Sequence, residues 1–403
     1  DGQYYYGRNM IMINHNGSIS QDPSWESDSV GYLSTIEIAD FDGDGDLDIL
    51  QSQPTNYSHI TLNNAGLMTN SDTKQMFDSG LGDYTRDAVV GDFNGDGIHD
   101  IITANYGSQN IINIASYADL SSSEYCSGEA SNAFCNGYDN SNAIWASPDN
   151  KSSTSIAVAD FDNDGDLDVA VGNYGEVNQI FINGGTGLEY QWSSWNSSDS
   201  KDTNKVAWAD YDNDGDLDLA VGNHGDVNQV FENNGGTIET TASWSSSDSM
   251  DTMDLEWGDI DGNGYVDLFI GNDEQKKQVF YNFASGMSTT SGWNSSDTYA
   301  TRSIALADID NDGDLDVAAG HETYYNTAVG NRKGLIIYEN NGTGISHSHT
   351  QTLNNYPTYD IDFKDIDTDG DLDLLYALHG TSNSVISYSF GFNINKFFIF
   401  KQF

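Results

Sequence analysis

The 403-residue sequence predicts an all-β fold made of repeated units, and two observations carry this prediction. An acidic nine-residue motif occurs seven times, with Asp at positions one and nine, Asp or Asn at three and five, and Gly at six. Successive copies start 52, 68, 50, 49, 49 and 57 residues apart, and each interval contains several short runs of alternating apolar and polar residues. A period of about fifty residues with such runs is typical of β-propeller blades or of a solenoid.

Each period contains four segments that we expect to be β-strands. In the third period, one segment enters the motif at residues 156–159 and the next leaves it at residues 167–172. A Gly-Asn-Tyr-Gly turn precedes a third segment at residues 178–183, and a Gly-rich turn precedes a fourth that ends in Trp195. The sequence therefore predicts a seven-bladed β-propeller of four-stranded antiparallel blades, with 1–403 as a single domain.

The acidic motifs predict calcium sites. Carboxylates at alternate positions of a tight loop repel one another unless a hard cation lies between them. Calcium accepts about six to eight oxygen ligands in irregular geometry, and a Gly at position six permits the sharp turn. Seven copies in register indicate about seven Ca²⁺, one in the loop of each blade.

The loops, their period and the Gly-Asn and Phe-x-Asn signatures resemble FG-GAP/VCBS repeats, the blades of integrin-α-like seven-bladed propellers. The resemblance covers residues 7–390. It implies that each metal loop joins the first and second strands of its blade. It also implies that calcium is bound by the side chains at positions one, three, five and nine and by the backbone carbonyl at seven. The ligands implied by this resemblance are Asp40, Asp42, Asp44, Asp46 and Asp48; Asp92, Asn94, Asp96, Ile98 and Asp100; Asp160, Asp162, Asp164, Asp166 and Asp168; Asp210, Asp212, Asp214, Asp216 and Asp218; Asp259, Asp261, Asn263, Tyr265 and Asp267; Asp308, Asp310, Asp312, Asp314 and Asp316; and Asp365, Asp367, Asp369, Asp371 and Asp373. Asn94 and Asn263 lower the charge of their loops, so we expect weaker calcium binding there.

The two ends of the chain offer more strands than one ring needs. Residues 1–25 have the pattern of a third and a fourth strand, which would close the ring by completing the last blade. Residues 384–388 show a third-strand pattern again, and an apolar tail follows at 391–403. We expect intramolecular closure, with donation of a terminal strand between subunits as the alternative.

Charge and cysteine content indicate an extracellular protein. The net charge is −49, and 31 of the 63 acidic residues belong to the seven motifs. Such a surface argues against nucleic acid or an anionic membrane as a partner, and no apolar run is long enough to span a membrane. Cys126 and Cys135 lie in an insertion at residues 106–150, where we expect a disulfide bond; two free thiols are the alternative. The first residue is Asp1, as in a processed secreted chain, and six glycosylation sequons begin at Asn16, Asn56, Asn150, Asn196, Asn294 and Asn341.

Aromatic residues recur at two places in the period. A tryptophan ends the fourth strand at Trp25, Trp145, Trp195, Trp244 and Trp293, and this periodic placement favours packing between blades over sugar stacking. The turns after the second strands carry varied aromatic and polar residues, which predict a ligand face opposite the metal loops. The residues of this possible ligand face are Tyr57, Tyr106, Tyr174, His224, Tyr324, Tyr325 and His379.

The sequence contains no recognisable catalytic motif and predicts no cofactor besides calcium. We therefore expect an extracellular recognition or adhesion module, secreted or at the cell surface, that binds a glycan or a cell-surface protein. The alternatives are a structural subunit that self-assembles through a terminal strand, and a calcium-dependent carbohydrate-active enzyme.

Overall fold

The computed structural model describes residues 9–12, 25–26, 34–52, 59–64, 67–75, 84–113, 143–184, 194–308, 312–322, 334–342, 344–346, 351–354, 357–366 and 373–378. These residues form β-strands and their connections, as the sequence predicts, with no helix among them. In the same residues no helix is long and apolar enough to cross a membrane. Cys126 and Cys135 lie outside the described residues.

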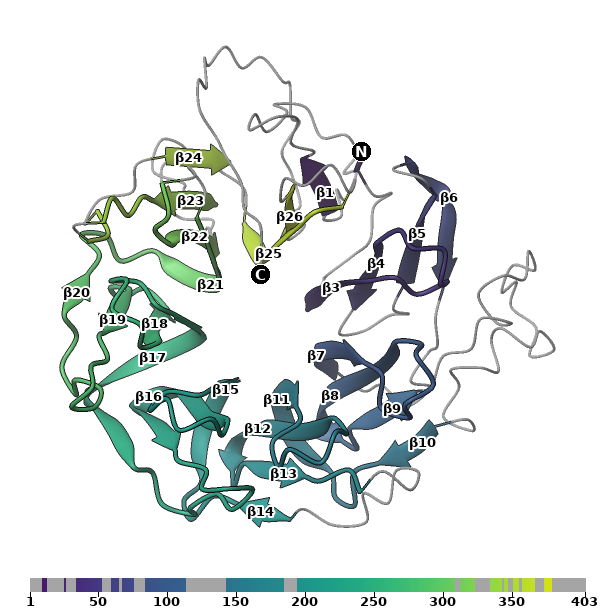
Figure 1. The fold of residues 1–403 in the computed structure, drawn as a ribbon. Helices are drawn as coiled ribbons and strands as arrows, with labels where there is room; N and C mark the ends of the chain where they lie inside the picture. The colour runs from purple at the N-terminus through teal and green to yellow at the C-terminus, as the bar shows by residue number, and fades with distance from the viewer. Residues whose placement is uncertain are drawn as a thin grey trace.

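The strands pair antiparallel in groups of four, which follow one another around a ring (Figure 1). The first groups in chain order are β3 (Thr35–Ala39), β4 (Asp48–Ser52), β5 (His59–Asn64) and β6 (Leu67–Gln75); β7 (Tyr84–Gly91), β8 (Asp100–Ser108), β9 (Ile111–Asn113) and β10 (Ala143–Ala146); and β11 (Lys151–Ala159), β12 (Asp168–Glu176), β13 (Gln179–Phe181) and β14 (Trp195–Asn196). The predicted insertion at residues 106–150 thus contains the regular strands β9 and β10, because residues 111–113 and 143–146 pair with each other in register with the repeat.

The later groups continue around the ring. They are β15 (Lys201–Ala209) and β16 (Asp218–Phe231) with the start of β17 (Trp244–Gly258); the end of β17 with β18 (Asp267–Asn272), β19 (Gln278–Phe280) and β20 (Trp293–Asn294); β21 (Ala300–Ala307), β22 (Asp316–Glu322), β23 (Leu335–Tyr338) and β24 (Gln351–Asn354); and β25 (Thr358–Lys364) and β26 (Asp373–Leu378) with β1 (Asn9–Met12) and β2 (Trp25–Glu26). In each group the first strand lies nearest the centre of the ring (Figure 1).

The last group combines the two ends of the chain. β1 pairs with β26, with Ile11 opposite Leu375, and β2 pairs with β1. Ile11 and Trp25 are buried there beside Ile36 of the neighbouring group. The free edge of β26 is therefore covered by a strand from the same chain. The third-strand pattern at residues 384–388 and the tail at 391–403 lie outside the described residues.

Some connections that the sequence marks as turns are strands. The predicted turn after residue 172 lies inside β12, because Tyr174 and Glu176 pair with Asp202 and Lys201 of the next group. In the same way, β17 runs from a fourth-strand position through the connecting link into the next first strand. Together with the pairing of β8 and β11, these links join β7 to β20 into one 14-stranded sheet.

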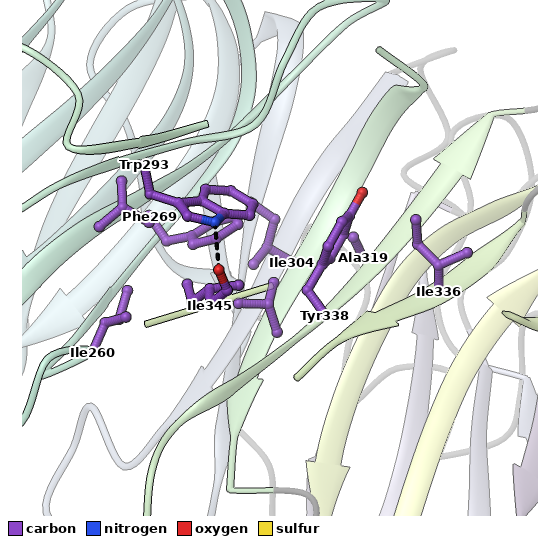
Figure 2. Close-up of a cluster of buried hydrophobic side chains, with 10 residues drawn as sticks. Ile260, Phe269, Trp293, Ile304, Ala319, Ile336, Tyr338 and Ile345 are labelled. Atoms are coloured by element: carbon purple, nitrogen blue, oxygen red, sulfur yellow. Dashed lines mark hydrogen bonds between the residues drawn. The ribbon is translucent and has the colours of Figure 1, made fainter. Parts of the chain in front are cut away.

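The tryptophans at the fourth strands pack between groups. The rings of Trp145, Trp195 and Trp244 lie 5.0 to 5.3 Å, edge to face, from Phe181, Phe231 and Phe280 of the next groups. Figure 2 shows the cluster around Trp293, whose indole Nε1 donates a 2.8 Å hydrogen bond to the carbonyl oxygen of Ile345 in the following group. A buried aromatic ring with a satisfied N–H contributes both apolar burial and a fixed orientation. These contacts lie between neighbouring groups, in agreement with the packing role that the sequence favours for the tryptophans.

The innermost strands are also linked side by side by hydrogen bonds. Asp87 on β7 accepts from the backbone N–H of Ile156 on β11 at 2.9 Å, and Asp254 on β17 accepts from Ile304 on β21 at 2.7 Å. Ser155 and Ser303 make the equivalent links at the next junctions. Asp360 on β25 accepts from Ile36 on β3 at 2.8 Å, so the last and first innermost strands are joined in the same way.

Candidate metal centres

Each described acidic loop connects the first and second strands of a group. The carboxylate at position one stabilises the turn by accepting backbone hydrogen bonds from within the loop. Asp160 accepts hydrogen bonds from the backbone N–H groups of Asp164 at 2.9 Å and Gly165 at 3.0 Å. Gly165, at position six, has φ +99°, a left-handed conformation that L-residues adopt only with strain. The loops of Asp40, Asp92, Asp210, Asp259 and Asp308 contain equivalent bonds to the backbone at position six.

The buried carboxylate at position nine holds the loop against the third strand of its group. Asp168 is fully buried, and its Oδ2 accepts from the backbone N–H of Phe161 while its Oδ1 accepts from that of Asn183, at 3.0 and 2.7 Å. The Asn183 side chain donates in turn to the carbonyl oxygen of Phe93 in the preceding group. Asp48, Asp218 and Asp267 are held by the same pair of backbone donors.

In four loops the carboxylates at positions one, three and nine converge, with one oxygen of each lying within 4.8 Å of the others. These groups are Asp40, Asp42 and Asp48; Asp160, Asp162 and Asp168; Asp210, Asp212 and Asp218; and Asp259, Asp261 and Asp267. Burial raises the pKa of the ninth-position aspartates Asp48, Asp168, Asp218 and Asp267 to about 7. Three converging carboxylates, one of them desolvated, are an arrangement that a bound cation would stabilise.

The donor set fits a hard cation. All three converging ligands are carboxylate oxygens, without sulfur or imidazole. In the third loop, Asp162 Oδ1 is buried and accepts no hydrogen bond from any described residue. A cation between the three carboxylates would satisfy this oxygen. The clusters could therefore hold metal ions.

Position five lies outside these groups. Asp164 is exposed, and its Oδ1 accepts from the backbone N–H of Asp166 at 3.1 Å; Asp44 and Asp214 bond in the same way. In these four loops, the structure thus brings together three of the four side chains expected at the site, without the one at position five. The fifth loop keeps this turn with Asn263, which accepts from the backbone N–H of Tyr265 at position seven. In the second loop Asn94 lies at position three and accepts from the backbone N–H of Asp96, the residue at position five. Ile98, at position seven of the second loop, donates its backbone N–H to Asp96.

The last two loops are described in part. Asp308, Asp312, Asp314 and Asp316 lie within the described residues, and so do Asp365 and Asp373, whereas Asp310, Asp367, Asp369 and Asp371 lie outside them. Asp373 accepts from the backbone N–H of Ile366 at 3.0 Å, as the ninth residue does in the other loops.

Three residues of the expected ligand face are described, at matching places in consecutive groups. Tyr106 is 37% exposed, and the Arg86 guanidinium lies 5.3 Å from its ring centroid. A hydrogen bond to Asp202 raises the pKa of Tyr174, and His224 Nδ1 lies 3.7 Å from Asp251 Oδ1. These side chains belong to strands rather than to free turns: Tyr106 and Tyr174 lie near the ends of β8 and β12, and His224 lies within β16. Tyr57, Tyr324, Tyr325 and His379 lie outside the described residues.

Asparagines at the end of the third strand tie four of the loops to the preceding group, a role that the Phe-x-Asn signature did not by itself indicate. Asn63, Asn183, Asn233 and Asn282 each follow the ninth-position Asp by 15 residues, and each donates its side-chain amide to the second loop residue of the preceding group. This fixed offset from the ninth-position Asp is the sequence signal by which these asparagines could have been identified. Asn63 donates to the carbonyl oxygen of Ile366, a second link between the first and last groups.

Comparison with known proteins agrees with this geometry. The FG-GAP-like repeat family matches the chain three times, at residues 160–221, 210–270 and 259–319, and each match starts at the first Asp of a loop. Residues 160–319 therefore consist of FG-GAP-like repeats, and the all-β fold built on them is that of a β-propeller. No curated protein sequence matches the chain.

Two solved structures share this fold over most of the chain. One is a crystal structure of BBS1N in complex with ARL6DN soaked with lead, with TM-score 0.52, 11% identity, and coverage of 87% of this chain and 93% of that one. The other is the same complex soaked with mercury, with TM-score 0.53, 10% identity, and coverage of 87% and 92%. Identity this low bears on the fold alone.

Proposed function

We propose that the chain is a calcium-stabilised, seven-bladed β-propeller that acts as an extracellular protein-recognition module. The observation that carries the calcium part is the convergence of three carboxylates, at positions one, three and nine, in four separate loops. The pairing of β1 with β26 and the links from Asp360 and Asn63 across the same junction support closure of the ring.

Calcium would be held by the carboxylates at positions one, three and nine, with position five and the carbonyl of position seven as the further ligands that the family resemblance implies. The ion would neutralise carboxylates that otherwise repel one another between the first and second strands of a group. Weak sites of this kind stay occupied at the millimolar calcium of extracellular fluids, which supports the extracellular assignment.

A protein is the partner class that we favour over a glycan. The related fold in the two solved structures, BBS1N, is crystallised in complex with another protein, ARL6DN. In this chain Tyr106, Tyr174 and His224 recur at matching positions of three neighbouring groups. Aromatic residues so placed are common anchors of protein interfaces, and a net charge of −49 favours a partner with a cationic surface.

The alternative of assembly through a terminal strand has less support in the described residues. β1 already occupies the edge of β26, so that edge offers no backbone groups to a second subunit.

The recognition part is tested by affinity capture from the extracellular fraction of the source cells, in millimolar calcium. The test variant replaces Tyr106, Tyr174 and His224 with alanine. Its matched control is Phe283→Ala, which removes another exposed aromatic (46% exposed) next to Asn282, on the side of the acidic loops. We expect the wild type and the control to retain the same protein and the triple variant to lose it. Equal capture by all three would place the interface elsewhere.

A further inference from the structure

One junction between strand groups departs from the repeat. At the start of the third strand, the second, third and fourth groups have an asparagine, whereas the fifth has Lys277. The asparagines are Asn110, Asn178 and Asn228. In the third strand of the next group, Tyr338 stands opposite Val317, the place that Phe280 takes opposite Leu268 one group earlier. Two unusual residues therefore meet at this junction.

Lys277 is enclosed by the protein. Its side chain is 0% exposed, and its Nζ lies 2.9 Å from Asp297 Oδ1. The ring centroids of Tyr338 and Tyr299 are 5.2 and 5.8 Å from Nζ. Burial lowers the pKa of Lys277, since a desolvated ammonium with one carboxylate partner is poorly stabilised.

The second carboxylate oxygen of Asp297, Oδ2, also accepts a hydrogen bond. The Tyr338 hydroxyl donates a 2.5 Å hydrogen bond to Asp297 Oδ2. Burial and the neighbouring carboxylate both raise the pKa of Tyr338, so the hydroxyl remains a donor. At the two preceding junctions the equivalent aspartates, Asp199 and Asp248, instead accept from the amides of Gln229 and Gln278.

The backbone holds the amine and the carboxyl in place. β19 and β20 pair with Gln278 opposite Asn294, and Lys277 N and O bond to Ser295 Oγ and N at 3.1 and 3.0 Å. Two reacting groups fixed at contact distance react far faster than the same groups in solution.

From this geometry we propose that Lys277 and Asp297 condense to an intramolecular isopeptide bond. Within the buried pair, a proton passes from the ammonium to the carboxylate. The lone pair of Nζ then attacks Cγ of the neutral carboxyl, and Tyr338 Oη–H stabilises the negative charge that develops on Oδ2. The Cγ–Oδ1 bond breaks, Oδ1 leaves with two protons as one water molecule, and the Nζ–Cγ amide remains. The reaction needs no oxidant, reductant or cofactor.

The surroundings favour the product. The amide replaces two buried ionisable groups with one neutral group, and a buried ion pair is costly to desolvate. The Asp297 side chain is 12% exposed, which gives the released water a path to solvent. Two other paired lysines, Lys151 and Lys201, have side chains 14% and 15% exposed, and their partner carboxylates are 38–47% exposed, so these pairs are in contact with solvent. Lys205 lies farther from its partner, with Nζ 3.4 Å from Asp254 Oδ1, and its side chain is 32% exposed.

Intact mass spectrometry of the purified, denatured wild-type chain tests the proposal. We expect a mass one water below that of the sequence. Trypsin would cleave after Lys276 but not after the acylated Lys277, and would yield residues 277–302 as one internally looped peptide, one water lighter than the linear form. Lys277→Arg and Asp297→Ala should restore the full mass. Tyr338→Phe, which introduces the residue found at Phe280, should slow the condensation.

Asp-Gly sequences in the acidic loops can also lose water by forming succinimides. The position of the water loss in the chain therefore distinguishes a succinimide from the isopeptide bond. Asp297 precedes Thr298, not a glycine, and residues 277–302 contain no Asp-Gly pair. A wild-type chain of full mass that trypsin cleaves after Lys277 would overturn the proposal and leave a buried ion pair. A water loss that persists in Lys277→Arg, or that maps outside residues 277–302, would overturn it equally.

Discussion

Replacing Asp168 with alanine separates the structural from the metal-binding role of the ninth loop position. The change removes the acceptor of two buried backbone N–H groups, those of Phe161 and Asn183. An unsatisfied buried donor costs about 1–3 kcal/mol, so the two together should lower the free energy of unfolding by roughly 2–6 kcal/mol even in excess chelator. The small side chain also leaves a void beneath the loop, which places the cost toward the upper end.

The matched control is Asp162→Ala in the same loop. Asp162 belongs to the same carboxylate group, yet its Oδ1 has no hydrogen-bond partner among the described residues. In chelator this variant should therefore be about as stable as the wild type, since removing one carboxylate relieves repulsion. In calcium it should lose part of the stabilisation that the wild type gains.

Denaturant unfolding of the three proteins, with calcium and with chelator, supplies the measurement. If Asp168→Ala unfolds like the wild type in chelator, Asp168 does not anchor the loop. If Asp162→Ala gains as much stability from calcium as the wild type does, Asp162 is not a metal ligand.

Three further predictions follow from the packing, the charges and the loop backbone. Trp293→Ala should lower the free energy of unfolding by about 3–5 kcal/mol, and Trp293→Phe by less, in denaturant titrations, because the indole fills the cluster between two groups; equal effects would contradict this. Burial and nearby carboxylates raise the pKa of Glu256 to about 8, so the folded state binds a proton that the unfolded state has released. Stability should therefore fall as pH rises from about 4 to 8, and the slope should be smaller in Glu256→Gln; identical slopes in calorimetry at constant calcium would contradict it. Gly165→Ala should cost about 1–2 kcal/mol in thermal melts, since φ +99° strains any L-residue although the space beside the glycine is open; an unchanged melting temperature would contradict it.

The repeat made the fold predictable. Seven acidic loops in register predicted the strand–loop–strand unit, and the family match and the strand pairing of residues 160–319 bear it out. The tryptophans could be assigned to packing because a residue that recurs at the same place in five of the seven groups serves the repeat rather than one ligand. The third- and fourth-strand patterns read in residues 1–25 coincide with β1 and β2.

Features that depend on neighbouring groups could not be predicted from one period. Residues 172–175 look like a turn because they contain two glycines. Gly172 and Asn173 still pair with β11 of the same group, however, and Tyr174 pairs with Asp202 in the first strand of the next group. Lys277 lies in a Glu-Gln-Lys-Lys segment typical of a solvated turn, and its burial arises from Tyr338 of another group. The carboxylates at positions one, three and nine converge without the one at position five. We attribute this to the two left-handed residues of the turn, which are Asn163 and Gly165 in the third loop.

The central claim, that calcium in the acidic loops stabilises the ring, is tested most directly by calorimetric melting of the full chain in chelator, in millimolar Ca²⁺ and in millimolar Mg²⁺. The account predicts a melting temperature several degrees higher in Ca²⁺ than in chelator, with little recovery in Mg²⁺, which prefers small octahedral sites. Superimposable melting curves in Ca²⁺ and in excess chelator would contradict it.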